Sequence, residues 1–102
     1  MGWATEGNKA NPAADEILAD TGPMQALSGI PITIVVSAKR ACILVVAQRN
    51  ALNTDDIDTQ RLYIESGTEI FPFSSMTFSL NERLVVRCQN DADEEVQASI
   101  LW

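Results

Sequence analysis

The sequence of 102 residues predicts an all-β protein, a small antiparallel β-sandwich with jelly-roll or Greek-key connections and an extended N-terminal arm. Two observations predict the sandwich. From residue 21 onward, short apolar runs rich in Val, Ile, Leu, Thr and Phe alternate with Gly, Pro, Asn and Asp, at spacings typical of antiparallel strands. These runs are too apolar for a single sheet, because one apolar face would stay in water, so two sheets are expected to pack together.

The arm is expected over residues 1–20 and the β-sandwich domain over residues 21–102. The arm consists mostly of Ala, Asn, Gly, Glu and Asp, and Asn11-Pro12 interrupts any regular element. Trp3 is the exception in this segment, since a large aromatic side chain is costly to leave in water. From the sequence, folding back onto the domain and docking on a partner are both open for Trp3.

Six or seven strands are expected in the domain. Residues 32–37 are almost continuously apolar, which predicts a central strand covered on both faces. The charged pair Lys39-Arg40 then makes a turn into residues 42–48. In that strand, alternation places two sets of side chains on opposite faces: Cys42, Leu44 and Val46 on one, Ile43, Val45 and Ala47 on the other.

Residues 50–58 are too acidic and too rich in Asn for a strand, and they predict a long loop. The next strand has Leu62 and Ile64 on its inward face. Residues 70–73 are aromatic and apolar, but Pro72 cannot donate a ladder hydrogen bond, so this piece is expected at a sheet edge or a bend.

The last three strands alternate clearly, and a strongly charged loop at residues 89–95 separates the final two. Their inward positions are predicted to be Met76, Phe78 and Leu80, then Leu84, Val86 and Cys88, and finally Val96, Ala98, Ile100 and Trp102.

The charge balance excludes some partners. With 7 basic and 14 acidic residues the formal net charge is −7, which repels a nucleic-acid backbone. No apolar run approaches the ~20 residues of a membrane span, and the first residues lack the pattern of a signal peptide. We therefore expect no nucleic acid and no membrane among the partners.

The residues of common catalytic sites are also missing. Because there is no histidine, neither a Ser/His/Asp nor a Cys/His arrangement can form, and no Gly-rich phosphate loop is present. Cys42 and Cys88 belong to no metal-ligand cluster. Two buried free thiols are the favoured interpretation, with a disulfide open if their strands are neighbours. The sequence predicts no enzyme, no cofactor and no metal site.

Two acidic loops leave weak surface calcium binding as a minor alternative. Neither fits an EF-hand, which needs Gly at its sixth position. Solvated turn residues that keep strand edges apart are the simpler interpretation. The carboxylates are Asp55, Asp56 and Asp58 in the first loop and Asp91, Asp93, Glu94 and Glu95 in the second.

Three strings carry a resemblance to known proteins. They are ADTG at residues 19–22, AQRNALN at 47–53 leading into RLYIESGTEIFPF, and SLNERLVVRCQND with a final ASILW. In this order they resemble small structural proteins of tailed bacteriophages, and more loosely the jelly-roll capsid decoration, or cement, proteins. The resemblance implies a virion protein, made in the host cytoplasm, that binds the major capsid protein as an oligomer, typically a homotrimer, and reaches over the shell with its arm.

This expectation assigns roles to particular residues. The capsid-binding anchors of the arm would be Trp3, Ile17 and Leu18. An oligomer interface is expected at Arg49, Arg61, Arg83, Arg87 and Trp102. For the arginines, cross-strand pairing with Glu65 or Glu82 on one sheet face is an equally good interpretation.

Two other functions remain open from the sequence. A head–tail junction or tail component would use the same fold in a ring of few copies. A carbohydrate-binding module would use Tyr63, Phe71 and Phe73 as a stacking platform, although three such aromatics in a sandwich more often belong to the core.

Overall fold

The computed structural model describes residues 2–102. Within this range the chain forms eight strands and no helix. They are β1 (Trp3–Thr5), β2 (Ile17–Asp20), β3 (Leu27–Ala38), β4 (Cys42–Arg49), β5 (Asp56–Ile64), β6 (Gly67–Phe78), β7 (Arg83–Cys88) and β8 (Val96–Leu101). Sheet A has the order β1-β8-β3-β6 and sheet B the order β2-β7-β4-β5. The predicted antiparallel β-sandwich is confirmed.

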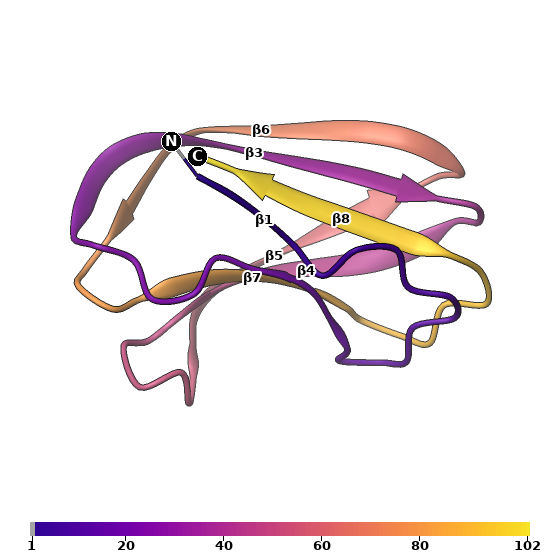
Figure 1. Ribbon diagram of the computed structural model, residues 1–102, viewed down its shortest axis with the longest axis horizontal. Helices are drawn as coiled ribbons and strands as arrows, with labels where there is room; N and C mark the ends of the chain where they lie inside the picture. Colours follow the sequence, from indigo (N-terminus) through magenta and orange to yellow (C-terminus); the bar gives the residue numbers. More distant parts are fainter. Residues whose placement is uncertain (1) are drawn as a thin grey trace.

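The connections are those of a jelly roll. β1 pairs with β8, β2 with β7, β3 with β6 and β4 with β5, so the chain is one long antiparallel hairpin rolled into two sheets. Additional pairing of β3 with β8 and of β4 with β7 closes each sheet of four strands. Figure 1 shows the two sheets edge-on, with β6, β3 and β8 above β5, β4 and β7.

The segment expected as an arm is extended, but it is part of both sheets rather than separate from them. β1 pairs with β8 with Trp3 opposite Leu101, and β2 pairs with β7 with Ile17 opposite Arg87. Between them, Lys9 forms a bridge with Val96. Backbone groups of these residues find partners on the sheet edges, which is why a segment with few apolar side chains is ordered here.

Three strand boundaries also differ from those expected. β3 is 12 residues long and begins at Leu27, and β5 already begins at Asp56, inside the expected acidic loop. The segments at 70–73 and 76–80 are one strand, β6, which takes the edge position in sheet A that Pro72 predicted. The pairing of β3 with β6 shifts register between Leu27 and Ile30 and again between Ile30 and Ile32, and it continues beyond both shifts.

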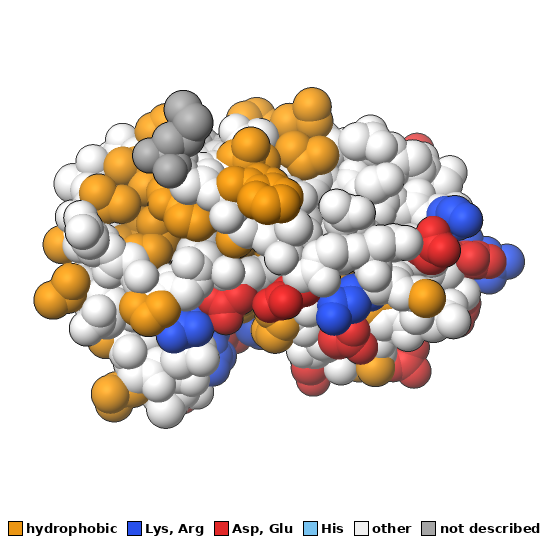
Figure 2. All heavy atoms as spheres, in the orientation of Figure 1, with side chains coloured by type: hydrophobic (Ala, Val, Ile, Leu, Met, Phe, Trp, Pro, Cys, Tyr) orange, Lys and Arg blue, Asp and Glu red, His pale blue; other side chains and the backbone are white. Residues whose placement is uncertain are grey.

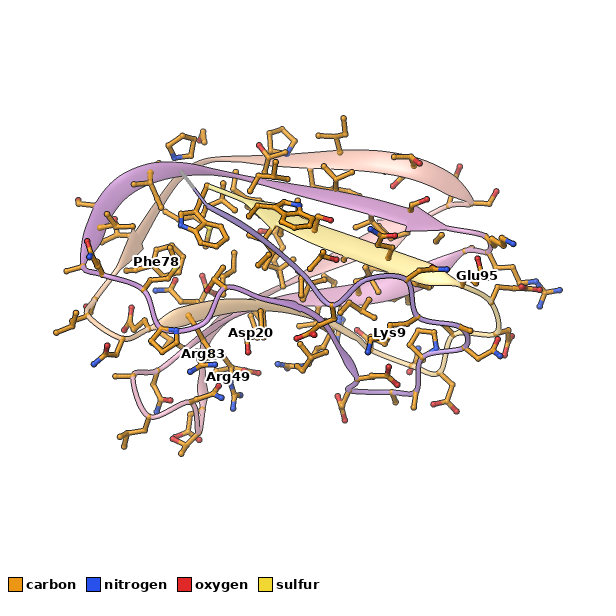
Figure 3. The ribbon with its side chains drawn as sticks, in the orientation of Figure 1. Lys9, Asp20, Arg49, Phe78, Arg83 and Glu95 are labelled. Carbon is orange, nitrogen blue, oxygen red and sulfur yellow. The ribbon has the colours of Figure 1, made fainter. Side chains whose placement is uncertain are left out.

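The core lies between the sheets and follows the predicted alternation. Its buried side chains include Leu44, Leu62, Ile64, Phe78, Leu84, Val86, Cys88, Val96, Ala98 and Ile100. Figure 3 shows Phe78 between the two layers. Leu80, also expected inward, is exposed instead because it lies in the turn after β6.

Both cysteines carry free thiols. Cys88 is buried, and burial raises the pKa of its thiol to about 11. Burial likewise raises the pKa of the Cys42 thiol, which is half-buried. Thiols with raised pKa values are poor nucleophiles at neutral pH, so these side chains act as small apolar groups of the core.

The sequence predicts that both faces of residues 32–37 are covered, but one face of β3 is open at the surface. In β3 the side chains of Ile32, Ile34 and Val36 are buried, but Thr33 and Val35 on the opposite face are only half-buried. Nothing in the described chain lies over them, because both sheets of the sandwich are already used in forming the core. An apolar strand therefore presents one of its faces at the surface of the molecule.

Candidate functional site

The first candidate surface is the outer face of sheet A, which we call the neutral face. The register places Trp3, Leu101, Thr33 and Pro72 in one row across the four strands. The next row holds Thr5, Ser99, Val35 and Ile70. Further along the same face lie Pro31, Ser37, Thr68 and Gln97.

None of these described side chains is ionisable, although 21% of the residues in the sequence are charged. Trp3 and Ile70 are each 66% exposed, and Leu101 is 39% exposed. Figure 2 shows orange side chains and no red or blue ones at the upper left, over β3, β8 and β1, while charged side chains lie below and to the right. Exposed apolar groups on an uncharged face are common at interaction surfaces, which makes this face a candidate.

A shallow apolar hollow lies at one end of the neutral face. Its volume is about 560 Å³, and it is wide open rather than enclosed. The lining residues are Gly2, Trp3, Pro31, Thr33, Leu101 and Trp102. The ring of Trp102 packs so closely on Gly2 that an added Cβ would lie 2.1 Å from Cε2. An open hollow with apolar walls can receive apolar side chains of another surface.

The second candidate surface is a trough on the outer face of sheet B, which we call the arginine trough. Its floor is a small apolar cluster of Val45, Ala47 and Val85, against which Ile17 packs. Figure 1 shows two loops that project below sheet B on either side, one after β4 and one before β2. The hollow between them has a volume of about 320 Å³ and is lined by Asp15, Ile17, Asp20, Arg49, Asn53, Val85 and Arg87.

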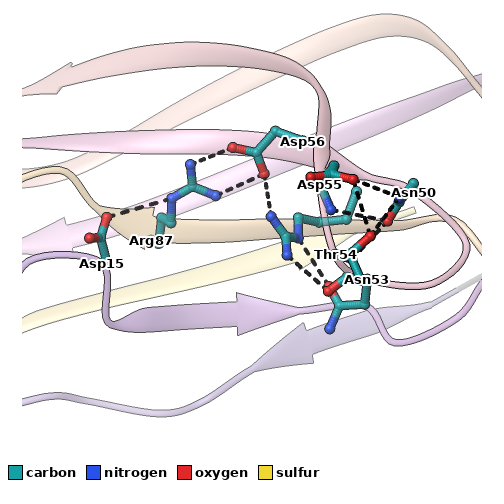
Figure 4. Close-up of polar contacts among 8 residues, drawn as sticks. Asp15, Asn50, Asn53, Thr54, Asp55, Asp56 and Arg87 are labelled. Atoms are coloured by element: carbon teal, nitrogen blue, oxygen red, sulfur yellow. Dashed lines mark hydrogen bonds and ion pairs between the residues drawn. The ribbon is translucent and has the colours of Figure 1, made fainter.

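Asp56 is the centre of the polar network in this trough (Figure 4). Arg87 donates two hydrogen bonds to its carboxylate, at 2.7 and 3.1 Å, and Arg49 donates one at 2.7 Å. Arg49 also donates to the side-chain oxygen of Asn53 at 3.0 Å. The hydrogen bonds from Arg87, and then those from Arg49, hold the pKa of Asp56 at about 2, well below its usual value.

Arg83 forms a separate pair at the end of the trough. It lies 3.1 Å from a carboxylate oxygen of Asp20. Figure 3 places Arg83, Asp20 and Arg49 together beneath sheet B. Arg49 and Arg83 thus pair with carboxylates on neighbouring strands, and Arg87 reaches Asp56 across β4. The second interpretation expected pairing on one sheet face with Glu65 or Glu82, but the partners are Asp56 and Asp20.

The residues expected at an oligomer interface are thus divided between two faces. Arg49, Arg83 and Arg87 lie on sheet B and are engaged within the chain. Arg61 is exposed on the edge strand β5 of the same sheet. Trp102 is half-buried and packs against the core near the neutral face. The structure does not bring Trp102 together with the arginines.

The expected arm anchors are also separated. Leu18 is fully buried and offers no surface to a partner, because its side chain packs into the core from the edge strand β2. Ile17 is half-buried on the floor of the arginine trough. Only Trp3 is largely exposed. Of the three, Trp3 is the residue that stays available for docking.

The aromatic platform of a carbohydrate-binding module does not form as expected. Phe71 and Phe73 pack against the core from sheet A. Tyr63 is 66% exposed on sheet B. Since the three aromatic side chains belong to different layers, they cannot stack on one ligand.

The carboxylates of the two acidic loops are dispersed. Asp55 accepts hydrogen bonds from Thr54 and Asn50, and Asp91 accepts one from the backbone of Ala14 at 2.8 Å. Arg40 lies 3.7 Å from Asp93. Within residues 2–102, no three His, Cys, Asp or Glu side chains are grouped in a way that could hold a metal ion. In the same range, no helix long and apolar enough for a membrane span occurs.

Sequence reasoning missed the neutral face, although a signal for it exists. Outward positions of exposed strands usually carry charged residues, whereas Thr33, Val35, Ile70 and Pro72 are all uncharged. Recognising it required knowing that β1, β8, β3 and β6 are neighbours, which no local pattern reveals.

Comparison with known proteins places the fold in the class of β-sandwiches. No protein-family model matches the sequence, and no curated protein matches it. Among solved structures, the chain is similar to one described as "CBM4 structure and function", a carbohydrate-binding module. The TM-score is 0.53 with 11% sequence identity, over 99% of this chain and 91% of that chain. At this identity the similarity shows the fold alone.

Proposed function

We propose that the protein is a structural protein of a tailed-bacteriophage particle, a capsid decoration protein that binds the outer surface of the shell and acts by adhesion rather than catalysis. The neutral face carries this proposal. It is broad, uncharged and partly apolar, and Trp3 is an exposed aromatic anchor of the type enriched in protein–protein contacts. The resemblance of the strings at residues 19–22, 47–53 and 79–91 to phage structural proteins supports the same function.

The jelly-roll connections are compatible with this role, because viral capsid domains use the same winding, as do lectin domains. A decoration protein stabilises a shell by binding several subunits at once. Each single contact can then be weak, because all of the contacts must break before the capsid subunits separate and their binding free energies add up.

Binding to shells tests the proposal. Purified protein is mixed with empty shells of the phage that encodes it, and the copies that sediment with the shells are counted. We expect saturable binding at hundreds of copies per shell, and Trp3→Ala should weaken it about tenfold because the aromatic anchor is lost. Tyr63→Ala, at an equally exposed aromatic on the other sheet, is the matched control.

Two results would reject decoration. Six or twelve copies per particle would indicate a ring in the head–tail junction or the tail instead. Absence of binding to shells and to tails alike would remove the virion function altogether.

A second candidate function is carbohydrate binding in the arginine trough. The observation that favours it is the combination of an apolar floor, formed by Val45, Ala47 and Val85, with planar polar side chains held rigidly above it by Asp56. Hydroxyl groups of a sugar can exchange hydrogen bonds with guanidinium, amide and carboxylate groups so arranged. The similarity to a carbohydrate-binding module lends this candidate fold-level support.

Affinity electrophoresis in gels containing soluble polysaccharides tests this candidate. If the trough binds carbohydrate, at least one polysaccharide should slow the migration of the protein. Arg49→Gln removes hydrogen-bond donors of the trough and should lower the affinity for that polysaccharide about tenfold. Arg61→Gln serves as control, because Arg61 does not line the trough. Equal mobility in every gel would discard the candidate.

A further inference from the structure

The arrangement of charge around the neutral face points to a particular partner. With 14 acidic against 7 basic residues, two copies of this chain repel each other over most of their surfaces. The neutral face is different because no described side chain on it is ionisable. A second copy can approach there without placing like charges in contact, and the exposed apolar groups provide the attraction.

We infer that the neutral face is the contact between two copies of this chain, which pack sheet A against sheet A about a two-fold axis. The inference rests on the proposed function for the idea that the face contacts protein, and it concerns the free protein. A copy held in the dimer cannot present the same face to a shell, so the two contacts compete for Trp3. A two-fold axis follows because the same patch is used by both copies, which makes the interface self-complementary. Trp3, Leu101, Ile70 and Pro72 supply the apolar contacts.

The geometry of the sheet supports this packing. The outer rows of four adjacent strands form a continuous face, and two such faces can stack at ~10 Å in the way sheets pack inside a sandwich. In the resulting dimer the two arginine troughs point away from each other, since each lies on the outer face of sheet B.

The size of the face sets the expected affinity. Across the sheet, four strands spaced at ~4.8 Å give a width of roughly 20 Å. Along the strands, about seven residues at ~3.3 Å each give a length of roughly 23 Å, so the face has an area of about 450 Å² per copy. This is about half the area per partner of a standard stable interface. We therefore expect a reversible dimer that forms at protein concentrations of tens to hundreds of micromolar.

Salt distinguishes this interface from one built on arginine ion pairs. Raising the salt concentration from about 0.05 to about 0.5 M screens the repulsion between two acidic copies, so a dimer through the neutral face should become tighter. An interface held by ion pairs from Arg49, Arg61, Arg83 and Arg87 would become weaker under the same change.

Sedimentation equilibrium of the purified full chain, without any capsid, tests the inference. We expect a monomer–dimer equilibrium that Ile70→Glu weakens at least tenfold, because it buries a carboxylate of each copy at the interface. Tyr63→Glu, equally exposed on the other sheet, should leave the equilibrium unchanged. Thermal unfolding of both variants checks that each remains folded.

A monomer at every concentration, a closed trimer, weakening by salt, or an Ile70→Glu variant that dimerises normally would each overturn the inference. Failure here is distinguishable from failure of the proposed function. If the chain stays monomeric but Trp3→Ala still loses shell binding, the neutral face contacts the capsid and only the inference falls. If the dimer forms but no shell or tail binds it, the inference stands and the virion function falls.

Discussion

Removing residues 1–20 is expected to abolish cooperative folding of the remaining chain. The deletion takes away β1 and β2, an edge strand from each sheet, and exposes the backbone groups of β8 and β7 that pair with them. It also removes Leu18 and Ala19, both fully buried in the core. A domain of this size has about 5–15 kcal/mol of stability, which the loss of two strands can exceed. Urea unfolding followed by circular dichroism is the measurement.

The single substitution Leu18→Ala tests the same contact without shortening the chain. It should lower the free energy of unfolding by about 3–4 kcal/mol, through lost burial and the cavity left between the sheets. Ile17→Ala is the control, because Ile17 is only half-buried on the outer face of sheet B and should cost about 1 kcal/mol. A truncated chain that unfolds with the midpoint of the full chain would show that residues 1–20 are an independent arm after all.

Replacing Asp56 by Asn is expected to lower the free energy of unfolding by about 1 kcal/mol at pH 7, because solvent screens this exposed ion pair, and by much less near pH 2. The carboxyl group of Asp56 has a pKa of about 2 in the folded protein, below its ordinary value of 3.8. Its ionised form therefore stabilises the fold above about pH 4, and this contribution is lost as the pH falls from about 4 to about 2. In the variant, Arg49 and Arg87 lose the anion that they share.

Urea unfolding at a series of pH values measures this difference. Asp58→Asn is the matched control, because Asp58 is an exposed aspartate on the same strand, β5. Its substitution should change the free energy of unfolding by less than about 0.5 kcal/mol. A deficit in Asp56→Asn that is the same at pH 2 and pH 7 would mean that the carboxylate charge contributes nothing.

The two candidate surfaces differ in their chemistry. The neutral face combines exposed apolar groups with an absence of ionisable side chains among its described residues, which suits contact with protein. The arginine trough is polar, and the carboxylates of Asp56 and Asp20 neutralise the charges of its arginines and hold their side chains in place. Arginines that are satisfied within their own chain are less available for a partner, which is why we propose the neutral face for the contact with protein.

The places that the structure gives to the expected anchors and interface residues have identifiable physical reasons. Leu18 was assigned to a partner because its segment has few apolar neighbours in sequence, but its strand pairs with β7, more than 60 residues away. The sequence offers Glu65 or Glu82 as cross-strand partners of the arginines, but the partner of Arg83 is Asp20, 63 positions away. For Trp3 the sequence allows either folding back onto the domain or docking on a partner, and the structure places its side chain exposed on the edge strand β1.

The pattern along the chain determined which side of each strand is apolar. Leu84, Val86 and Cys88, or Val96, Ala98 and Ile100, alternate with other residues, and alternation is a local property because successive side chains of a strand point to opposite faces. The all-β class and the edge position that Pro72 predicted for β6 follow from equally local chemistry.

Only the tertiary structure decided which strands are neighbours. The pairing of β1 with β8 and of β2 with β7 joins the two ends of the chain, so it placed Trp3 beside Leu101 and Asp20 beside Arg83. Such pairings are set by the summed packing of both sheets and by backbone groups that must all find partners, and neither leaves a mark in a short stretch of sequence. The neutral face and the arginine trough are both consequences of that pairing.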